Sequence, residues 1–565
     1  MTGCKRGLMA TLLAGVATAA LASTTLAAEQ ARLAQGDDPY YRQAQEQMRR
    51  IMTQQRNTNR AKNVILIVGD GMGFSTVTAT RIFEGQQRGV DGESNVLAWE
   101  AFPYLAAAKT YSSDAQITDS APSAVAMTAG VKTINDVMGI DHTSRLESCE
   151  DQKAKHVTTL WEMAESIGMS TGAVTTAHLT HAMPGATFAH IADRDWESDA
   201  DMTPEALDAG CADIARQLVE MPFGDGLEVA MGGGRAYFLP TTADDPEDEG
   251  KKGRRKDGRD LTKAWLDRYP NSGAFVWNKE QFDKLYPNSV DHVLGLFEMS
   301  HMEYEHDRPK DKGGEPSLAE MAEKAIDILA KNPEGYVLLI EGGRVDHASH
   351  AGNAYRTLTD GVALNEAVKA VLRKVNLDET LIVVTGDHSH TLTINGYAKR
   401  GNPILGISVG VDDKVILGDD GKPYTTISFA NGPGSKEPKA AAPATAAAAP
   451  TTTAEPAVQT GAATPPKTDA ATPVAPAYAG RPRPDLTMEQ ATDPDYIQQA
   501  LVPMASETHG GEDLGIYAIG PWAHLFQGTV EENYTFHVMD FASKISERAT
   551  AAAGGAQPVR KAEVK

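Results

Sequence analysis

The chain has 565 residues and a mass of 60.3 kDa, and 41% of its residues are hydrophobic, which is ample for a large core. Its formal net charge is −23 and its pI is about 5.1, so the surface repels phosphate backbones and nucleic-acid binding is disfavoured. A site for an anion in such a protein would need local positive charge, most simply from bound metal cations.

The first 28 residues have the layout of a signal peptide. Lys5 and Arg6 precede an apolar run at 7–22, and small residues lead to an expected cleavage point within 25–28. A transmembrane anchor is the alternative, but the run is short, and no other stretch approaches the roughly 20 apolar residues of a spanning helix. We therefore expect an exported protein, periplasmic or secreted, without stable membrane insertion.

Export also bears on the three cysteines. Cleavage of the signal peptide would remove Cys4 and leave Cys149 and Cys211. Two cysteines in an exported chain most simply form one disulfide, and two buried free thiols are the alternative.

Residues 29–62 are polar and rich in Gln and Arg, and we interpret them as an N-terminal arm, for which a helix is one possibility. Beyond it, unbroken aliphatic runs are typical of strands covered on both faces; they lie at 64–68, 337–340 and 381–384. Helical patterns lie between them, at 157–167, 204–218 and 316–330. This order predicts an α/β fold: a three-layer sandwich with a large, mostly parallel central sheet flanked by helices.

Other segments interrupt this pattern. Residues 243–260 are charged and glycine-rich, which indicates a surface loop. Residues 435–480 are dominated by Ala, Pro and Thr and cannot bury enough apolar surface to order, so we predict a disordered insertion. One more strand is expected at 516–520, and a flexible tail at 549–565. The catalytic domain would then comprise 63–434 and 481–548.

Each of the three aliphatic runs ends in an acidic residue next to glycine: Asp70, Glu341 and Asp387. Ligands of open parallel sheets bind beyond the carboxyl ends of the strands, so three distant segments can bring carboxylates to one crevice. A turn or a cap explains a single such aspartate, but explains three of them poorly.

Histidines accompany these acids. Asp346 and His350 are four residues apart, which places them on one face of a helical turn and suits a borderline metal such as zinc. His388 directly follows Asp387, and His509 lies in a glycine-rich turn. Two further histidines are weaker candidates: His347, which has the wrong spacing, and His390.

Ser120 is the candidate nucleophile. It precedes Pro122 and a run of small residues, which predicts a tightly packed helix beginning near Ser120. A helix N-terminus favours an anion, but Ser120 as a simple N-cap is the alternative interpretation. The segment also resembles the Cys/Ser-x-Pro-x-Arg signature of sulfatases, although Ala124 occupies the arginine position.

From about Asn63 to Phe541 the chain resembles the alkaline phosphatase family, and the animal-type branch in particular. The resemblance is carried by five motifs, which read GDGMG at 69–73, DSA at 119–121, EGGRVDH at 341–347, GDHSH at 386–390 and ETHGGED at 507–513. It implies hydrolysis of phosphate monoesters through a phosphoserine at Ser120, usually in a homodimer.

The resemblance also implies roles for single residues. One Zn²⁺ would bind Asp346, His350 and His509, and a second would bind Asp70, Asp387 and His388 beside Ser120. A third site, usually Mg²⁺, would use Asp70 and Glu341, with His181 near its waters. Arg194 matches the arginine that grips two phosphate oxygens, and Cys149 and Cys211 match a disulfide pair.

Two features depart from the family pattern or match it only partly. Met183 stands where the family has a Ser or Thr ligand of the magnesium ion, and a thioether is a poor partner for a hard cation. The branch also carries a structural Ca²⁺, whose pattern includes Glu247, the Phe297 carbonyl, Glu298 and Glu315, the last in place of Asp; an acidic surface loop is the alternative. Rival functions are a phosphodiesterase of the same superfamily and a non-catalytic metal-binding or adhesion protein.

Overall fold

The computed structural model describes residues 34–435 and 483–554, so the predicted signal peptide and the predicted insertion beyond Ser435 lie outside the described residues. Two units make up the chain, one ending at Arg56 and the other beginning at Asn57. The first contains α2 (Pro39–Thr53), which lies within the predicted arm. Asp38 caps this helix by accepting a hydrogen bond from the Tyr41 amide, and no residue of α2 is buried.

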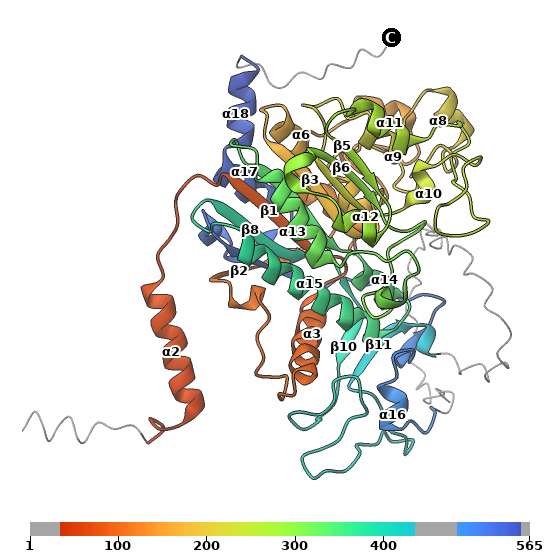
Figure 1. The fold of residues 1–565 in the computed structure, drawn as a ribbon. Coiled ribbons are helices and arrows are strands. Elements are labelled where there is room, and N and C mark those ends of the chain that lie inside the picture. Colours follow the sequence, from red (N-terminus) through yellow and green to blue (C-terminus); the bar gives the residue numbers. More distant parts are fainter. Residues whose placement is uncertain (1–33, 436–482, 555–565) are drawn as a thin grey trace, which may run out of the picture. The chain divides into compact units, whose positions relative to one another are not determined.

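The second unit is built on a ten-stranded sheet with the strand order β15-β2-β14-β8-β1-β7-β3-β4-β6-β5 (Figure 1). The strands from β8 to β5 in this order are parallel, whereas β14 is antiparallel to both of its neighbours. Their bounds are β1 Asn63–Gly69, β2 Tyr104–Lys109, β3 Ser170–His178, β4 Val229–Gly233, β5 Gly273–Val276, β6 His292–Leu296, β7 Tyr336–Gly342, β8 Thr380–Gly386, β14 Leu514–Ile519 and β15 Gly528–Glu531. The predicted mostly parallel sheet is confirmed.

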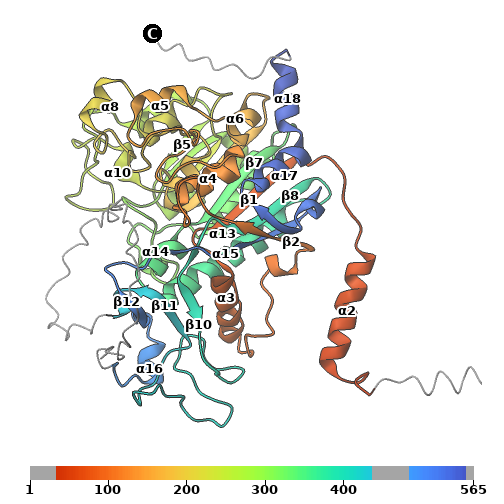
Figure 2. The same ribbon diagram turned by 180° about the vertical axis from the view of Figure 1, so that it is seen from behind.

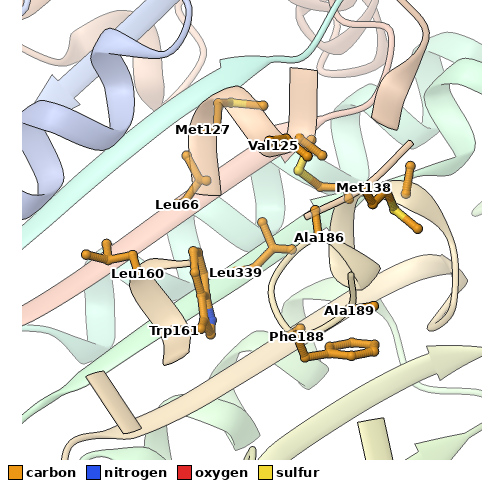
Figure 3. Packing of buried hydrophobic residues seen from close by; sticks show 14 of the residues in the cluster. Leu66, Val125, Met127, Met138, Leu160, Trp161, Ala186, Phe188, Ala189 and Leu339 are labelled. Atoms are coloured by element: carbon orange, nitrogen blue, oxygen red, sulfur yellow. The ribbon is translucent and has the colours of Figure 1, made fainter. Parts of the chain in front are cut away.

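Side chains of the central strands alternate between two hydrophobic cores. Leu66 and Leu339 belong to the core on one face of the sheet, while Ile65 and Leu338 belong to the core on the other. Figure 3 shows Leu66 and Leu339 packing with Val125 and other residues of the first core. Because both faces are buried, the strands read as unbroken aliphatic runs rather than alternating ones.

Helices cover both faces and complete the three layers (Figure 2). Helices that contribute to the first core include α4 (Ser120–Ala129), α6 (Leu160–Glu165), α9 (Ile214–Val219), α11 (Leu261–Arg268), α17 (Tyr534–Ser543) and α18 (Ile545–Ala552). Those of the second include α12 (Lys279–Asp283), α13 (Leu318–Leu329) and α15 (Ala354–Lys374). α5 (Cys149–Ala154), α7 (Ala182–Gly185), α8 (Pro204–Asp208) and α10 (Arg235–Phe238) also add residues to the first core, and α3 (Phe74–Gln87) adds one to the second. The remaining helices are α14 (Arg344–His350) and α16 (Met488–Ala491).

Two expectations need correction. The helix predicted at 204–218 is two helices, because Gly210 has a left-handed φ of 76° after α8 and Asp213 caps a new start at α9. The predicted surface loop at 243–260 is only partly exposed. Arg255 within it is fully buried and donates to both carboxylate oxygens of Asp213, at 2.9 Å each.

Smaller features complete the described part. β10 (Leu392–Ile394), β11 (Ile427–Gly432) and β12 (Ala500–Pro503) form a second sheet, and β9 (Ser389–His390) pairs with β13 (His509–Gly510). A disulfide joins Cys149 to Cys211. Among the described residues, no helix has the length and apolar character needed to cross a membrane.

Candidate active site

The three predicted strand-end carboxylates come together at one edge of the sheet. β1 lies between β7 and β8, and Gly69 pairs with both Gly342 and Gly386, so the three strands end in register. The carboxylates at these ends are Asp70, Glu341 and Asp387, and all three are fully buried.

These carboxylates lack enough hydrogen bonds to satisfy their oxygens. The buried oxygens without a hydrogen-bond donor are both of Asp70, Oε1 of Glu341 and Oδ2 of Asp387. Burial, reinforced by the charge of Asp346, raises the pKa of Asp70 to about 8. Burial and the charge of Asp70 likewise raise the pKa of Asp387 to about 7. The surrounding protein groups do not offset the cost of ionising these buried carboxyl groups, and a bound cation would do so.

Asp346, His350 and His509 converge beside this edge. α14 places His350 Nε2 3.4 Å from Asp346 Oδ1, and β13 brings His509 Nε2 to 3.4 Å from the same oxygen. The Nδ1 atoms of the two histidines lie against backbone carbonyls, of Glu507 at 2.6 Å and Thr118 at 2.9 Å. Donation from Nδ1 to these carbonyls would leave each Nε2 lone pair available to a metal, as in metal-binding histidines. One ligand atom each from Asp346, His350, His390 and His509 lies within a common 4.8 Å.

Ser120 lies next to a second group of possible ligands. Its hydroxyl is 3.0 Å from His388 Nε2, which in turn lies 3.3 Å from Asp70 Oδ1 and 3.5 Å from Asp387 Oδ2. Burial lowers the pKa of His388 to about 3, so the ring is neutral and has a free lone pair. Asp70, Asp346 and His388 each offer one ligand atom within a common 4.8 Å.

The first turn of α4 shows whether Ser120 is the N-cap of the helix, which was the alternative to its being the nucleophile. The N-cap of this helix is Asp119, whose Oδ1 accepts from the Ala121 amide at 2.7 Å. Ser120 is therefore not the cap, and its side chain is available to face His388. Pro122 lies in the first turn, as predicted.

Arg194 approaches the same place from a loop after β3. Its Nη1 donates to Asp119 Oδ1 at 3.0 Å, and its Nη2 lies 2.9 Å from His181 Nε2. His181 Nδ1 is 4.0 Å from Asp70 Oδ2, and burial holds the pKa of His181 well below its ordinary value. The predicted phosphate-binding arginine is thus brought to the start of α4.

A third group of possible ligands comprises Asp70, His181 and Glu341. The hydroxyl that contacts Glu341 comes from Thr175, which the β3–β7 register places opposite it. Met183 is fully buried and belongs to the apolar core instead. Thr175 carries no local sequence signal, because only the strand pairing brings it to Glu341.

The residues expected around calcium are only partly gathered. Glu247, Glu298 and Asp311 form one possible metal group, and Phe297 is buried beside Glu298. Glu315 is outside this group and accepts from the Glu303 amide at 3.0 Å. Asp311 was not expected from the sequence.

Glu507, His390 and Asp346 form a buried relay of hydrogen-bond contacts. From the sequence, His390 was only a weaker candidate. Glu507 Oε2 lies 2.6 Å from His390 Nδ1, and His390 Nε2 lies 2.7 Å from Asp346 Oδ1. Although burial opposes it, the charges of Glu507 and Asp346 hold the pKa of His390 well above its ordinary value. The signal was present in the alternation of His388 and His390, but nothing local indicated Glu507 as the partner.

Comparison with known proteins places this arrangement in context. A family model described as alkaline phosphatase matches residues 61–475 and 470–545. The tissue-nonspecific alkaline phosphatase isozyme of Gallus gallus is 40% identical over 530 residues, which cover 92% of each chain. The same isozyme of Homo sapiens is 40% identical over 517 residues, covering 90% of this chain and 89% of the human one.

Solved structures show the same fold at lower identity. The alkaline phosphatase of Thermus thermophilus matches with a TM-score of 0.57 and 21% identity over 89% of this chain and 97% of its own. That of the Antarctic bacterium TAB5 matches with a TM-score of 0.52 and 19% identity over 86% and 99%. These two likenesses bear on the fold alone.

Proposed function

This chain belongs to the alkaline phosphatase family, whose members are metal-dependent phosphomonoesterases, and we propose that Ser120 is the nucleophile with which it hydrolyses phosphate monoesters. The observation that carries the proposal is the hydroxyl of Ser120, which lies 3.0 Å from His388 at the edge where the buried carboxylates meet.

The donor sets fit the metals of the family. We propose Zn²⁺ at Asp346, His350 and His509, and a second Zn²⁺ at Asp70, Asp387 and His388, because mixed imidazole and carboxylate ligands suit zinc. Oxygen ligands from Asp70 and Glu341 suit Mg²⁺ at the third position, with Thr175 in place of the thioether of Met183. When bound, these cations would neutralise phosphate charge and favour the ionised hydroxyl.

The chain's own residues supply the remaining parts of the reaction. Arg194, which donates to Asp119, would grip two phosphate oxygens, and the N-terminus of α4 would favour the anion. The Ser120 oxygen forms a bond to phosphorus as the bond to the leaving alcohol breaks, giving a phosphoserine. Water then displaces Ser120, which regains its proton, and inorganic phosphate leaves.

Substitution of the nucleophile tests this proposal. We expect Ser120→Ala to lose nearly all turnover of a chromogenic monoester while its zinc content stays at the wild-type value. Ser123→Ala is the matched control, since Ser123 lies one turn along α4 and bonds only to backbone carbonyls. Wild-type turnover by Ser120→Ala would assign the nucleophile elsewhere.

The rival activity is tested with paired substrates. A monoester and a diester with the same leaving group should differ in kcat/KM by several orders of magnitude in favour of the monoester. A preference for the diester would instead indicate a phosphodiesterase.

Three further proposals concern the whole protein. A Ca²⁺ would bind Glu247, Glu298 and the Phe297 carbonyl, with Asp311 supplying a carboxylate in addition to, or in place of, Glu315. The disulfide supports export to an oxidising compartment. A homodimer is proposed by analogy with the family.

A further inference from the structure

A second group of ionisable side chains lies at the opposite edge of the sheet from Ser120. β4 and β6 are parallel neighbours, so their first residues meet at the amino edge. His292 begins β6, and Glu228 directly precedes β4. Asp225 lies in the turn leading to β4, and Glu165 ends α6 nearby. None of these residues takes part in the proposed phosphatase reaction.

Three of these side chains offer ligand atoms to one point. One atom each from Asp225, Glu228 and His292 lies within a common 4.8 Å, and His292 Nε2 is 3.5 Å from Asp225 Oδ2. The side chain of Asp225 is 70% exposed, whereas that of His292 is 6% exposed. The group is therefore buried at His292 and reaches solvent at Asp225.

His292 itself indicates a ligand. Both of its ring nitrogens are buried and make no hydrogen bond. The ring is held in place by stacking on Tyr269, with centroids 3.7 Å apart and planes within 7°. Burial lowers the pKa of His292, which favours the neutral imidazole that binds metals. A fixed, buried imidazole without a hydrogen-bond partner is costly unless something binds it.

The two glutamates add buried carboxyl groups whose ionisation nothing nearby compensates. Glu228 Oε2 accepts from the Thr171 amide at 2.6 Å, and Glu165 Oε1 accepts from the Thr171 hydroxyl at 2.5 Å, while Glu165 Oε2 makes no hydrogen bond. Burial and the charge of Glu228 raise the pKa of Glu165 to about 10, and burial raises that of Glu228 to about 7. The nearby Arg268 donates to backbone carbonyls instead, including that of Asp225 at 3.0 Å.

Gly224, in the turn before β4, allows the backbone to approach the carboxyl group of Glu165. Gly224 has a φ of +52°, and a Cβ at this position would lie 2.3 Å from Glu165 Oε2. Any other residue would push the carboxylate away, so the glycine lets the turn close over Glu165.

We propose that Asp225, Glu228 and His292 form a divalent-metal site, with Glu165 as a further carboxylate beside it. One imidazole and two or three carboxylates suit a borderline cation such as Zn²⁺ or Mn²⁺. Its role is structural: the cation ties the turn at 223–228 to the start of β6 at the edge of the sheet remote from Ser120.

Counting bound zinc tests the site. The full-length protein is dialysed against buffered Zn²⁺, and the metal per chain is measured by mass spectrometry. At the lowest free Zn²⁺ concentration that fills the site in the wild type, the wild type should hold one more zinc ion per chain than Asp225→Asn or His292→Gln. Titration should show at least tenfold weaker binding of that last zinc ion in both variants. Because Asp225 is exposed, Asp225→Asn is expected to fold even if His292→Gln does not.

Two controls separate this site from the catalytic one. Asp291→Asn removes a neighbouring carboxylate that pairs with Lys331 and is not in the group, so it should bind zinc like the wild type. Monoester kcat/KM should be unchanged in Asp225→Asn. Equal zinc content in wild type and Asp225→Asn, or the same loss in Asp291→Asn, would overturn the proposal, whatever the activity.

Discussion

At the scale of single residues, the candidate site includes buried groups that lie behind its proposed metal ligands. His390 and Glu507 are fully enclosed behind Asp346, and the distances of 2.6 and 2.7 Å fix the orientation of that carboxylate. Such outer partners orient metal ligands and raise their affinity.

We predict that Glu507→Gln weakens zinc binding by about 10- to 100-fold, because a neutral amide no longer holds His390 against Asp346. Zinc competition with a chromogenic chelator measures the change, and excess zinc should restore kcat. Glu489→Gln, on the half-exposed surface helix α16, is the control. Unchanged zinc affinity in Glu507→Gln would show that the relay does not position Asp346.

Asp360 gives a pH-dependent prediction. It is buried in α15, and burial, with the charge of Glu305 nearby, raises its pKa to about 8. Between about pH 4 and pH 8 the unfolded chain loses this proton while the folded chain keeps it, so wild-type stability falls as pH rises through this window. Asp360→Asn has no such carboxyl group, so its stability should not fall in this way. The difference in free energy of unfolding, variant minus wild type, should increase by up to about 1.4 kcal/mol for each unit of pH between about 4 and 8.

Denaturant melts at several pH values measure this difference. Asp419→Asn, at an exposed position, should track the wild type throughout. If the Asp360→Asn and wild-type curves are parallel, Asp360 does not titrate in this range.

At the scale of elements, the strands with the strongest local pattern were predictable from the sequence, and so were the acids at their ends. β1, β7 and β8 carry unbroken aliphatic runs because both faces are covered, and their shared register brings the three strand ends together. The sequence indicates His509 as a candidate ligand in a glycine-rich turn, but only the resemblance assigns it to Asp346 and His350, because its position depends on the two-residue pairing of β13 with β9. Thr175 and Glu507 were missed for the same reason, since cross-strand partners leave no local pattern.

The turn between β1 and α3 supplies a prediction at this scale. Gly71 has a φ of +72°, and a Cβ there would lie 2.4 Å from the ring of His390. We expect Gly71→Ala to lower the free energy of unfolding by about 1 kcal/mol, because alanine is strained in the left-handed backbone conformation. We also expect it to lose most of its zinc and activity, because the added Cβ displaces His390. Gly89→Ala has a similar φ of +78° and open space around its Cβ, so it should show only the first effect. Equal zinc content in both variants would contradict this.

At the scale of the whole molecule, the candidate active site lies at one edge of the sheet, and the disulfide lies in the surrounding helices. It links the first residue of α5 to the segment after α8 across 62 residues. We predict that replacing both cysteines by serine lowers the free energy of unfolding by about 2–4 kcal/mol and leaves kcat/KM at 25 °C unchanged. Thermal melts with and without reductant measure the first quantity. A loss of activity in the folded variant would connect the disulfide to the site.

The pairing of β9 with β13 also has a consequence for how the protein is made. Asp70 emerges early in synthesis, and His509 follows only after most of the chain has been translated. A nascent chain that stops short of β13 has the early carboxylates but not the histidine that closes the first group of ligands. If Asp346, His350 and His509 bind zinc as proposed, we expect metal capture to be among the last events of biosynthesis, and retention of zinc to distinguish completed chains from truncated ones.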